Sequence, residues 1–107
     1  MKDLNQLLND MLNASIAIES YAFDSYETFV DDEKTQDAIM YKLIILGEAA
    51  NSISSEFQVK HPEIPWSSII GTRNVIVHGY DQVKTQIVWD IIKNNIPQLR
   101  KSLKDLV

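Results

Sequence analysis

The chain has 107 residues, a length that fits one domain over residues 1–107, because a second domain would need a core of its own. It contains no cysteine, which excludes disulfides, thiolate metal sites and a cysteine nucleophile, and which fits a reducing cytoplasm. A formal net charge of −5 at pH 7 argues against general coating of nucleic-acid backbone, but one local basic pocket could still bind a short single-stranded substrate.

The first half of the chain has the apolar spacing of two long helices. Only three glycines and three prolines interrupt the sequence, too few for an all-β protein with many turns. The spacing predicts one helix from about Asp3 to Phe23 and a second from about Asp31 to Phe57, whose acidic start favours the positive end of the helix dipole. Gly47, which costs about 1 kcal/mol relative to alanine in a helix, would with the two alanines that follow let another helix approach closely.

The second half is divided by its prolines and a glycine. Each proline in His61–Trp66 favours an extended residue before it, so this segment is predicted as a loop. Its second proline suits the start of a third helix over about residues 66–78, which Gly79 would end. A fourth helix is expected from about Val83, and Pro97 bends or divides it. The prediction is an all-α protein, a compact four- to five-helix up-down bundle.

No targeting or membrane segment stands out in the sequence. The N-terminus lacks the basic-then-apolar stretch of a signal peptide, and no uninterrupted apolar run is long enough to span a bilayer. We therefore expect a soluble, cytoplasmic protein.

The residues of greatest chemical interest lie around the end of the third predicted helix, in Gly71–Tyr80. Asn74 and His78 are four residues apart and therefore neighbours on one helical face, whereas Arg73 and His78 are five apart, about 140° around an ideal helix. One copy of the chain would thus present an incomplete site. A two-fold dimer would bring a second Arg73 and a second His78 into the same cleft.

Arginine and histidine together suit phosphodiester cleavage by the 2′-hydroxyl of the RNA itself. A histidine with an ordinary pKa of about 6.5 can accept or donate a proton at neutral pH. The guanidinium of Arg73 matches phosphate oxygens and can stabilise charge in the transition state, and Asn74 can orient the imidazole of His78 or hold a phosphate oxygen. Because no hydrolytic water need be activated, this route requires neither a metal ion nor a cofactor.

Each of these residues also has a plain structural interpretation. His78 can act as a cation at the negative end of the helix dipole, Arg73 can form a surface salt bridge, and Asn74 can bond the helix end. Tyr80 can close the turn as a half-buried aromatic. The residues alone therefore suggest a phosphate-binding site without deciding its function.

Other conspicuous side chains have simpler expectations. Trp66 and Trp89 fit core anchors better than base-stacking platforms. Glu48 is expected to be solvated, and His61 has no obvious partner in its proline-bounded loop.

Arg73, His78 and Tyr80 stand in the spacing R-x4-H-x-Y, which resembles the motif of HEPN ribonucleases. Further segments agree in order and spacing with the HepT-like branch of that superfamily: Leu46–Ala50, His61–Trp66 and Arg73–Asn74, with Trp89 and Ile96–Leu99 matching its C-terminal helix. The resemblance covers nearly the whole chain and implies a single HEPN (HepT-like) domain over residues 1–107.

The resemblance implies a metal-independent endoribonuclease toxin of a type VII-like toxin–antitoxin pair, active on RNA as a homodimer. Its antitoxin would be a small MNT-type nucleotidyltransferase that silences the toxin by adding AMP to the motif tyrosine, here Tyr80, to give O-AMP-tyrosine. Family roles carry over to Arg73 and His78 as catalytic residues and to Asn74 as a supporting residue, with no metal ligand and no cofactor.

The chain departs from the family pattern beside the motif. Asn74–Val77, which follow Arg73, lack the extra basic side chains of many relatives, and Asp81 follows Tyr80 where an aromatic is common. Both differences lower the expected RNA affinity. They keep an alternative open, a catalytically weak RNA- or nucleotide-binding helical module that partners a nucleotidyltransferase. A purely structural helical dimer is a third interpretation.

Overall fold

Helices form all the regular secondary structure in the computed structural model, which describes residues 2–21 and 24–107. The elements in chain order are α1 (Leu4–Ser20), α2 (Tyr26–Val30), α3 (Glu33–Ser52), α4 (Ser55–Lys60), α5 (Trp66–Gly79), the 3-10 helix η1 (Tyr80–Gln82), α6 (Thr85–Asn94) and α7 (Ile96–Leu106). The predicted all-α class is confirmed, but the described residues form seven α-helices where four or five were predicted, because α2 and α4 are short and the last helix is divided. None of the helices described is long and apolar enough to cross a membrane.

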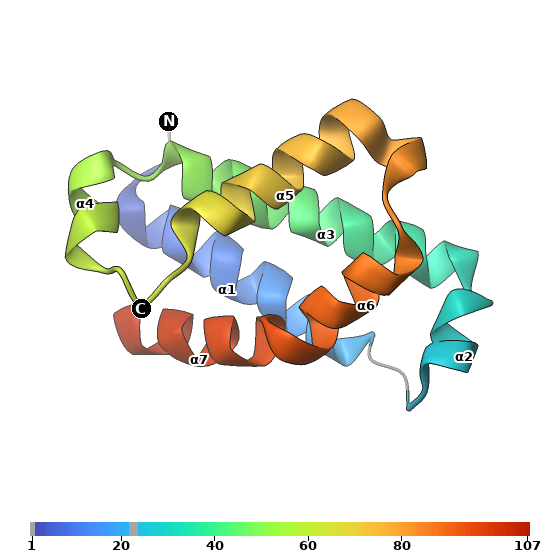
Figure 1. The fold of residues 1–107 in the computed structure, drawn as a ribbon. Helices are drawn as coiled ribbons and strands as arrows, with labels where there is room; N and C mark the ends of the chain where they lie inside the picture. The colour runs from blue at the N-terminus through green and yellow to red at the C-terminus, as the bar shows by residue number, and fades with distance from the viewer. Residues whose placement is uncertain (1, 22–23) are drawn as a thin grey trace.

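α3 is the central helix of the bundle (Figure 1). α1 and α5 both pack along it, and α7 packs against α1. α2 closes one end by contacting α3 and α6. The interior is apolar, and each large side chain buried there contributes about 1.5–3 kcal/mol. The most deeply buried of these residues are Phe29, Leu8, Met11, Ile18, Ile39, Ile64, Ile76, Ile96 and Leu103.

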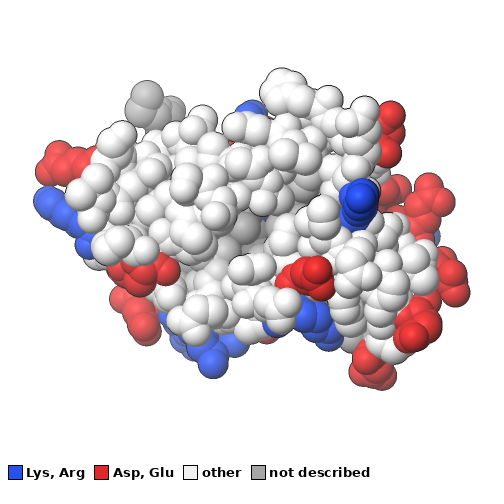
Figure 2. Space-filling model, viewed as in Figure 1, with Lys and Arg blue, Asp and Glu red and all other residues white. Residues whose placement is uncertain are grey.

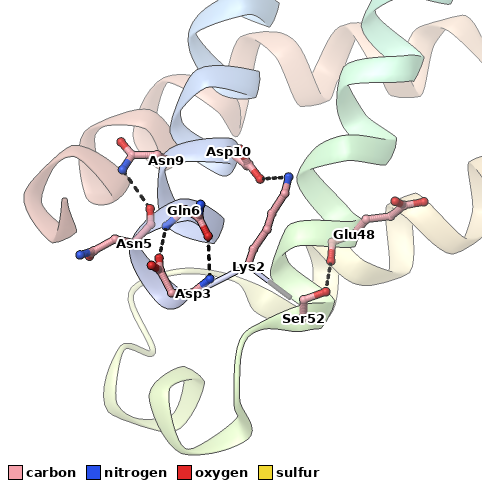
Figure 3. Close-up of polar contacts among 8 residues, drawn as sticks. All are labelled: Lys2, Asp3, Asn5, Gln6, Asn9, Asp10, Glu48 and Ser52. Atoms are coloured by element: carbon pink, nitrogen blue, oxygen red, sulfur yellow. Dashed lines mark hydrogen bonds and ion pairs between the residues drawn. The ribbon is translucent and has the colours of Figure 1, made fainter.

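Capping side chains explain where the first and third helices begin. Asp3 accepts a hydrogen bond from the backbone N–H of Gln6 at 2.9 Å, and the Gln6 side chain accepts one from the N–H of Asp3, also at 2.9 Å (Figure 3). Asp32 caps α3 by accepting a hydrogen bond from the N–H of Thr35 at 3.0 Å. The acidic stretch therefore begins the second long helix, as predicted.

The predicted ends of the first two helices are too late. α1 ends at Ser20, and the predicted end, Phe23, lies outside the described residues. α3 stops short of Phe57 because Ile53 adopts extended backbone while its side chain stays buried. Ser54 then caps α4 by accepting a hydrogen bond from the N–H of Phe57 at 3.2 Å. A buried isoleucine fits helical spacing, so periodicity could not reveal this break.

The second half follows its prediction more closely. α5 begins at Trp66, directly after the loop proline, and its last residue is Gly79. The indole N–H of Trp66 donates to the carbonyl of His61 at 2.9 Å, which closes the loop on itself. Asn95 separates α6 from α7, and Pro97 lies in the first turn of α7, where its missing N–H leaves no helical hydrogen bond unmade. Pro97 thus divides the last predicted helix rather than bending it.

α5 crosses α3 at Gly47, where the absence of a side chain allows close contact. A Cβ placed on Gly47 would lie 2.1 Å from the Cβ of Arg73 and 3.2 Å from the carbonyl oxygen of Ile69. This explains a glycine that helix propensity disfavours, and it confirms the prediction that small residues here admit a neighbouring helix. The crossing fixes the backbone of Arg73 directly against α3.

Gly47→Ala should destabilise the fold, although alanine is favoured in a helix by about 1 kcal/mol. The added methyl group overlaps Arg73, and overpacking of this kind costs about 1–3 kcal/mol, so we expect a net loss in the free energy of unfolding. Gly71→Ala is the matched control, because Gly71 is also helical and, apart from its chain neighbours and the backbone of its own helix, no described atom lies within 4 Å of its Cβ position. The free energy of unfolding of Gly71→Ala should rise by up to about 1 kcal/mol. Urea unfolding measures both, and a stabilised Gly47→Ala protein would contradict the close crossing.

Candidate active site

Two antiparallel helices and the turn after one of them position the candidate residues. α5 carries Arg73 and His78, and Tyr80 is the first residue of η1. α5 runs opposite to α3, as the colour order in Figure 1 shows. Arg73 therefore contacts Glu48 in the C-terminal part of α3, and Tyr80 contacts Asp37 near its N-terminal end.

Arg73 is a partly buried arginine with a fixed orientation. Its side chain is 26% exposed, and its Nη2 lies 3.6 Å from Oε1 of Glu48. Its Nη1 donates to Oδ1 of Asn74 at 2.7 Å. Its Nε is buried and has no partner within the part of the chain that the structure describes. An unbonded buried donor costs about 1–3 kcal/mol, so this placement does not serve stability alone. The contacts with Glu48 and Asn74 orient the guanidinium.

His78 lies in the last turn of α5 with an exposed side chain. Within residues 2–21 and 24–107 its imidazole makes no hydrogen bond or ion pair, so both ring nitrogens are open to a substrate. α5 is continuous through Arg73 and His78, which places the two side chains about 140° apart around the helix. One subunit therefore does not bring the two predicted catalytic side chains together.

Tyr80 is half exposed, and its hydroxyl donates a hydrogen bond to Oδ1 of Asp37. This hydrogen bond raises the pKa of the Tyr80 phenol above its usual value, and the negative charges of Asp37 and Glu33 act in the same direction. The phenol is therefore protonated at neutral pH. Its oxygen lies beside a carboxylate and in contact with solvent.

Sequence reasoning missed the two acidic residues of α3 that hold the candidate site. Glu48 is solvated as expected, with its side chain 58% exposed, but its carboxylate also pairs with Arg73, which the sequence did not reveal. Figure 3 shows this carboxylate pointing away from Ser52, whose hydroxyl bonds the Glu48 carbonyl at 3.0 Å. Asp37 had no assigned role, since 43 residues separate it from Tyr80. Gly47 was the signal for the helix crossing, but it did not identify which side chains would meet.

The other histidine has structural partners. The ring of His61 packs on Phe57 with centroids 4.3 Å apart, and its Nδ1 lies 3.3 Å from Oε2 of Glu63, so the expectation of no partner is wrong. Trp66 is buried as predicted, and Trp89 is partly buried against the aromatic residues of α2. These residues belong to the packing of the bundle and not to the candidate site.

The negative charge of the chain is unevenly distributed. Figure 2 shows acidic side chains crowding the end formed by α2 and the start of α3, where Glu27, Asp31, Asp32 and Glu33 line a shallow surface hollow. Basic side chains gather along the lower edge of the same view, over α7. Among the described residues, no three histidine or acidic side chains converge as a set of metal ligands.

An all-α bundle with an arginine and a histidine on one helix and a tyrosine just after it has the arrangement expected of a HEPN-type ribonuclease domain. The family model described as "Ribonuclease HepT-like" matches residues 11–106. The chain belongs to the HepT-like ribonuclease family, as the motif resemblance implied.

Several relatives carry ribonuclease names. The chain is 35% identical over 100 residues to "Probable ribonuclease HepT" of Thermococcus cleftensis, covering 92% of this chain and 91% of that protein. It is 37% identical over 83 residues to "Putative RNase TTE0752" of Caldanaerobacter subterraneus subsp. tengcongensis, covering 78% and 74%. It is 30% identical over 107 residues to "Putative RNase MJ0127" of Methanocaldococcus jannaschii, covering 99% and 88%. No solved structure matches the chain significantly.

Asp37→Asn should lower the pKa of Tyr80 toward the ordinary tyrosine value, because it removes the charge of the hydrogen-bond acceptor. Ring-labelled tyrosine NMR, titrated from about pH 8 to about pH 12, measures the shift. Tyr41 is the internal control, since it is 61% exposed and has no hydrogen bond within the described residues. An unchanged Tyr80 titration in the variant would mean that the contact does not persist in solution.

Proposed function

We propose that this protein is a metal-independent endoribonuclease toxin of a type VII-like toxin–antitoxin pair, which acts in the cytoplasm as a homodimer. The observation that carries the proposal is an oriented, partly buried Arg73 on the same helix as an exposed His78. The first binds phosphate, and the second transfers protons near neutral pH. Membership of a ribonuclease family supports this chemistry.

The proposed cleavage step uses the 2′-hydroxyl of the RNA as nucleophile. His78 accepts the proton of this hydroxyl as the 2′-oxygen bonds to phosphorus. The bond from phosphorus to the 5′-oxygen of the next nucleotide breaks, that oxygen takes a proton from water, and His78 returns its proton to the hydroxide that is left. Arg73 stabilises the negative charge on the phosphoryl oxygens, and Asn74 keeps the guanidinium oriented. The products are a 2′,3′-cyclic phosphate and a 5′-hydroxyl.

A two-fold dimer across the exposed side of α3 and α5 would complete this site. On these helices Val77 is 45% exposed, and Ile44 and Ile70 are partly buried; these three residues define the α3–α5 face. Large apolar side chains gathered on one solvent-facing surface are typical of an interaction site. The side chains of Arg73 and His78 extend from α5 in different directions, so Arg73 of one subunit could act with His78 of the other.

Purified protein should cleave single-stranded RNA in the presence of a chelator and leave 2′,3′-cyclic phosphate ends. His78→Ala should lower the rate at least about a hundredfold, the usual contribution of a general base. His61→Ala is the matched control, since that histidine contacts Glu63 in the loop before α5. The folded His61→Ala variant should cleave RNA like wild type. Activity lost in chelator and restored by magnesium, or products with a 3′-hydroxyl, would contradict the mechanism.

One observation favours a second candidate, a catalytically weak RNA- or nucleotide-binding module that partners a nucleotidyltransferase. Arg73 is already paired with Glu48, and the chain carries a net charge of −5, so a substrate phosphate meets competition at its binding group. In the cleavage assay this candidate predicts binding without cleavage, and no difference between wild type and His78→Ala.

Silencing by an MNT-type nucleotidyltransferase antitoxin is the second part of the proposal. Tyr80 is 50% exposed, so its hydroxyl is accessible to a partner enzyme that holds ATP. An AMP group on this oxygen would add a phosphate charge and a bulky base just after His78 in the chain. Repulsion of the RNA phosphate and simple obstruction would both oppose substrate binding.

Tyr80→Phe should keep much of the cleavage activity and escape silencing, because it lacks only the hydroxyl that receives AMP. Intact-mass measurement after incubation with ATP and the cognate nucleotidyltransferase tests this. Wild type should gain one or more AMP units and lose ribonuclease activity, whereas the variant should gain none. No mass gain on wild type, or an equal gain on Tyr80→Phe, would show that this tyrosine is not the switch.

A further inference from the structure

Tyr80 and Asp37, which share a hydrogen bond, both line a second surface hollow. This hollow has a volume of about 290 Å³ and is lined by residues of α2, α3, η1 and α6. Its acidic lining residues are Glu33, Asp37 and Asp81, and no lysine or arginine lines it among the described residues. Of these three acidic residues, only Asp37 accepts a hydrogen bond from the Tyr80 hydroxyl.

We infer that Asp37 is the proton acceptor that makes Tyr80 a nucleophile for nucleotidyl transfer, so that the chain supplies the general base for its own modification. This inference rests on the proposed silencing at Tyr80. In the step, the phenolic oxygen of Tyr80 bonds to the α-phosphorus of ATP while its proton passes to the Asp37 carboxylate. The bond from the α-phosphorus to the oxygen bridging to the β-phosphorus breaks, and pyrophosphate leaves with that electron pair. Asp37 then releases the proton to water.

The surroundings of Tyr80 make such a base necessary. A phenol attacks phosphorus well only as its proton leaves, and a carboxylate that accepts a hydroxyl proton is the arrangement kinases use for the same purpose. The hydrogen bond to Asp37 and the negative charges of Asp37 and Glu33 raise the pKa of Tyr80, and no lysine or arginine lines the hollow among the described residues, so free phenolate is disfavoured there. The proton must therefore leave during the transfer. Asp37 is already hydrogen-bonded to the oxygen that loses it.

The same contact would select one tyrosine over another. Tyr41 on α3 is more exposed than Tyr80, 61% against 50%, yet it has no hydrogen bond to a carboxylate within the described residues. Exposure alone would make Tyr41 the better target. A general base at Asp37 would instead make Tyr80 the more reactive tyrosine.

Adenosine 5′-phosphorimidazolide tests the inference without any partner enzyme, because it donates AMP to nucleophiles with imidazole as the leaving group. Wild type, Asp37→Asn and Glu33→Gln are incubated with it, and peptide mass spectrometry gives the AMP on Tyr80 and Tyr41. At about pH 7, Asp37→Asn should lower labelling of Tyr80 about a hundredfold and leave Tyr41 unchanged. Glu33→Gln, the matched loss of charge, should not lower Tyr80 labelling. Asp37→Glu, which keeps a carboxylate, should retain part of it.

The pH profile separates a base-assisted phenol from a phenolate. Unassisted tyrosine reacts as phenolate, whose share rises about tenfold per pH unit below the tyrosine pKa, whereas a phenol with a bound base does not need prior ionisation. The ratio of Tyr80 to Tyr41 labelling should therefore fall as the pH rises in wild type and stay constant in Asp37→Asn. If Tyr80 reacts as phenolate, Asp37→Asn raises its labelling, and that result would overturn the inference.

Failure here is distinguishable from failure of the proposed function. RNA cleavage in chelator by wild type and His78→Ala is measured on the same preparations and involves neither AMP donor nor Asp37. Cleavage that depends on His78, with Tyr80 labelling equal in wild type and Asp37→Asn, would overturn the role of Asp37 while leaving the ribonuclease intact. Equal loss of Tyr80 labelling in Asp37→Asn and Glu33→Gln would also overturn it, since charge alone would then explain the effect.

Discussion

Where α5 crosses α3, the Cβ of Arg73 occupies the space that a side chain on Gly47 would need. Because Gly47 has no side chain, the two helices can lie close together. At this short separation the guanidinium of Arg73 reaches Glu48, and it also bonds Asn74. The antiparallel contact continues along α5 and η1 until Tyr80 meets Asp37. A single glycine therefore allows the helix contact that brings Arg73 and Tyr80 against acidic side chains of α3.

The ion pair of Arg73 with Glu48 orients the arginine without binding it tightly. The separation is 3.6 Å and the Glu48 side chain is 58% exposed, and pairs of this kind contribute about 0–1 kcal/mol. A phosphate can accept two parallel hydrogen bonds from a guanidinium, so it competes well against such a partner. The pair can thus orient Arg73 and still exchange Glu48 for another anion.

Local signals predicted helix boundaries such as the start of α3 at the acidic stretch and the interruption of the last helix by Pro97. They missed the break at Ile53, because a buried isoleucine satisfies helical spacing even when its backbone is extended. The three motif residues were found through their spacing, and the catalytic roles of Arg73 and His78 and the modification of Tyr80 stay predictions. The acidic residues that contact two of them, Glu48 and Asp37, could not be identified from the sequence, since those contacts arise only from the packing of α5 on α3.

The central claim is that Arg73 of one subunit acts with His78 of the other. Arg73→Ala and His78→Ala should each be inactive alone, but co-refolding them forms mixed dimers that retain one intact pair across the interface. About half of randomly assorted dimers are mixed and each would have one working pair of two, so roughly a quarter of wild-type cleavage should return. No recovery in a mixture whose mixed dimers are seen by native mass spectrometry would contradict a shared site.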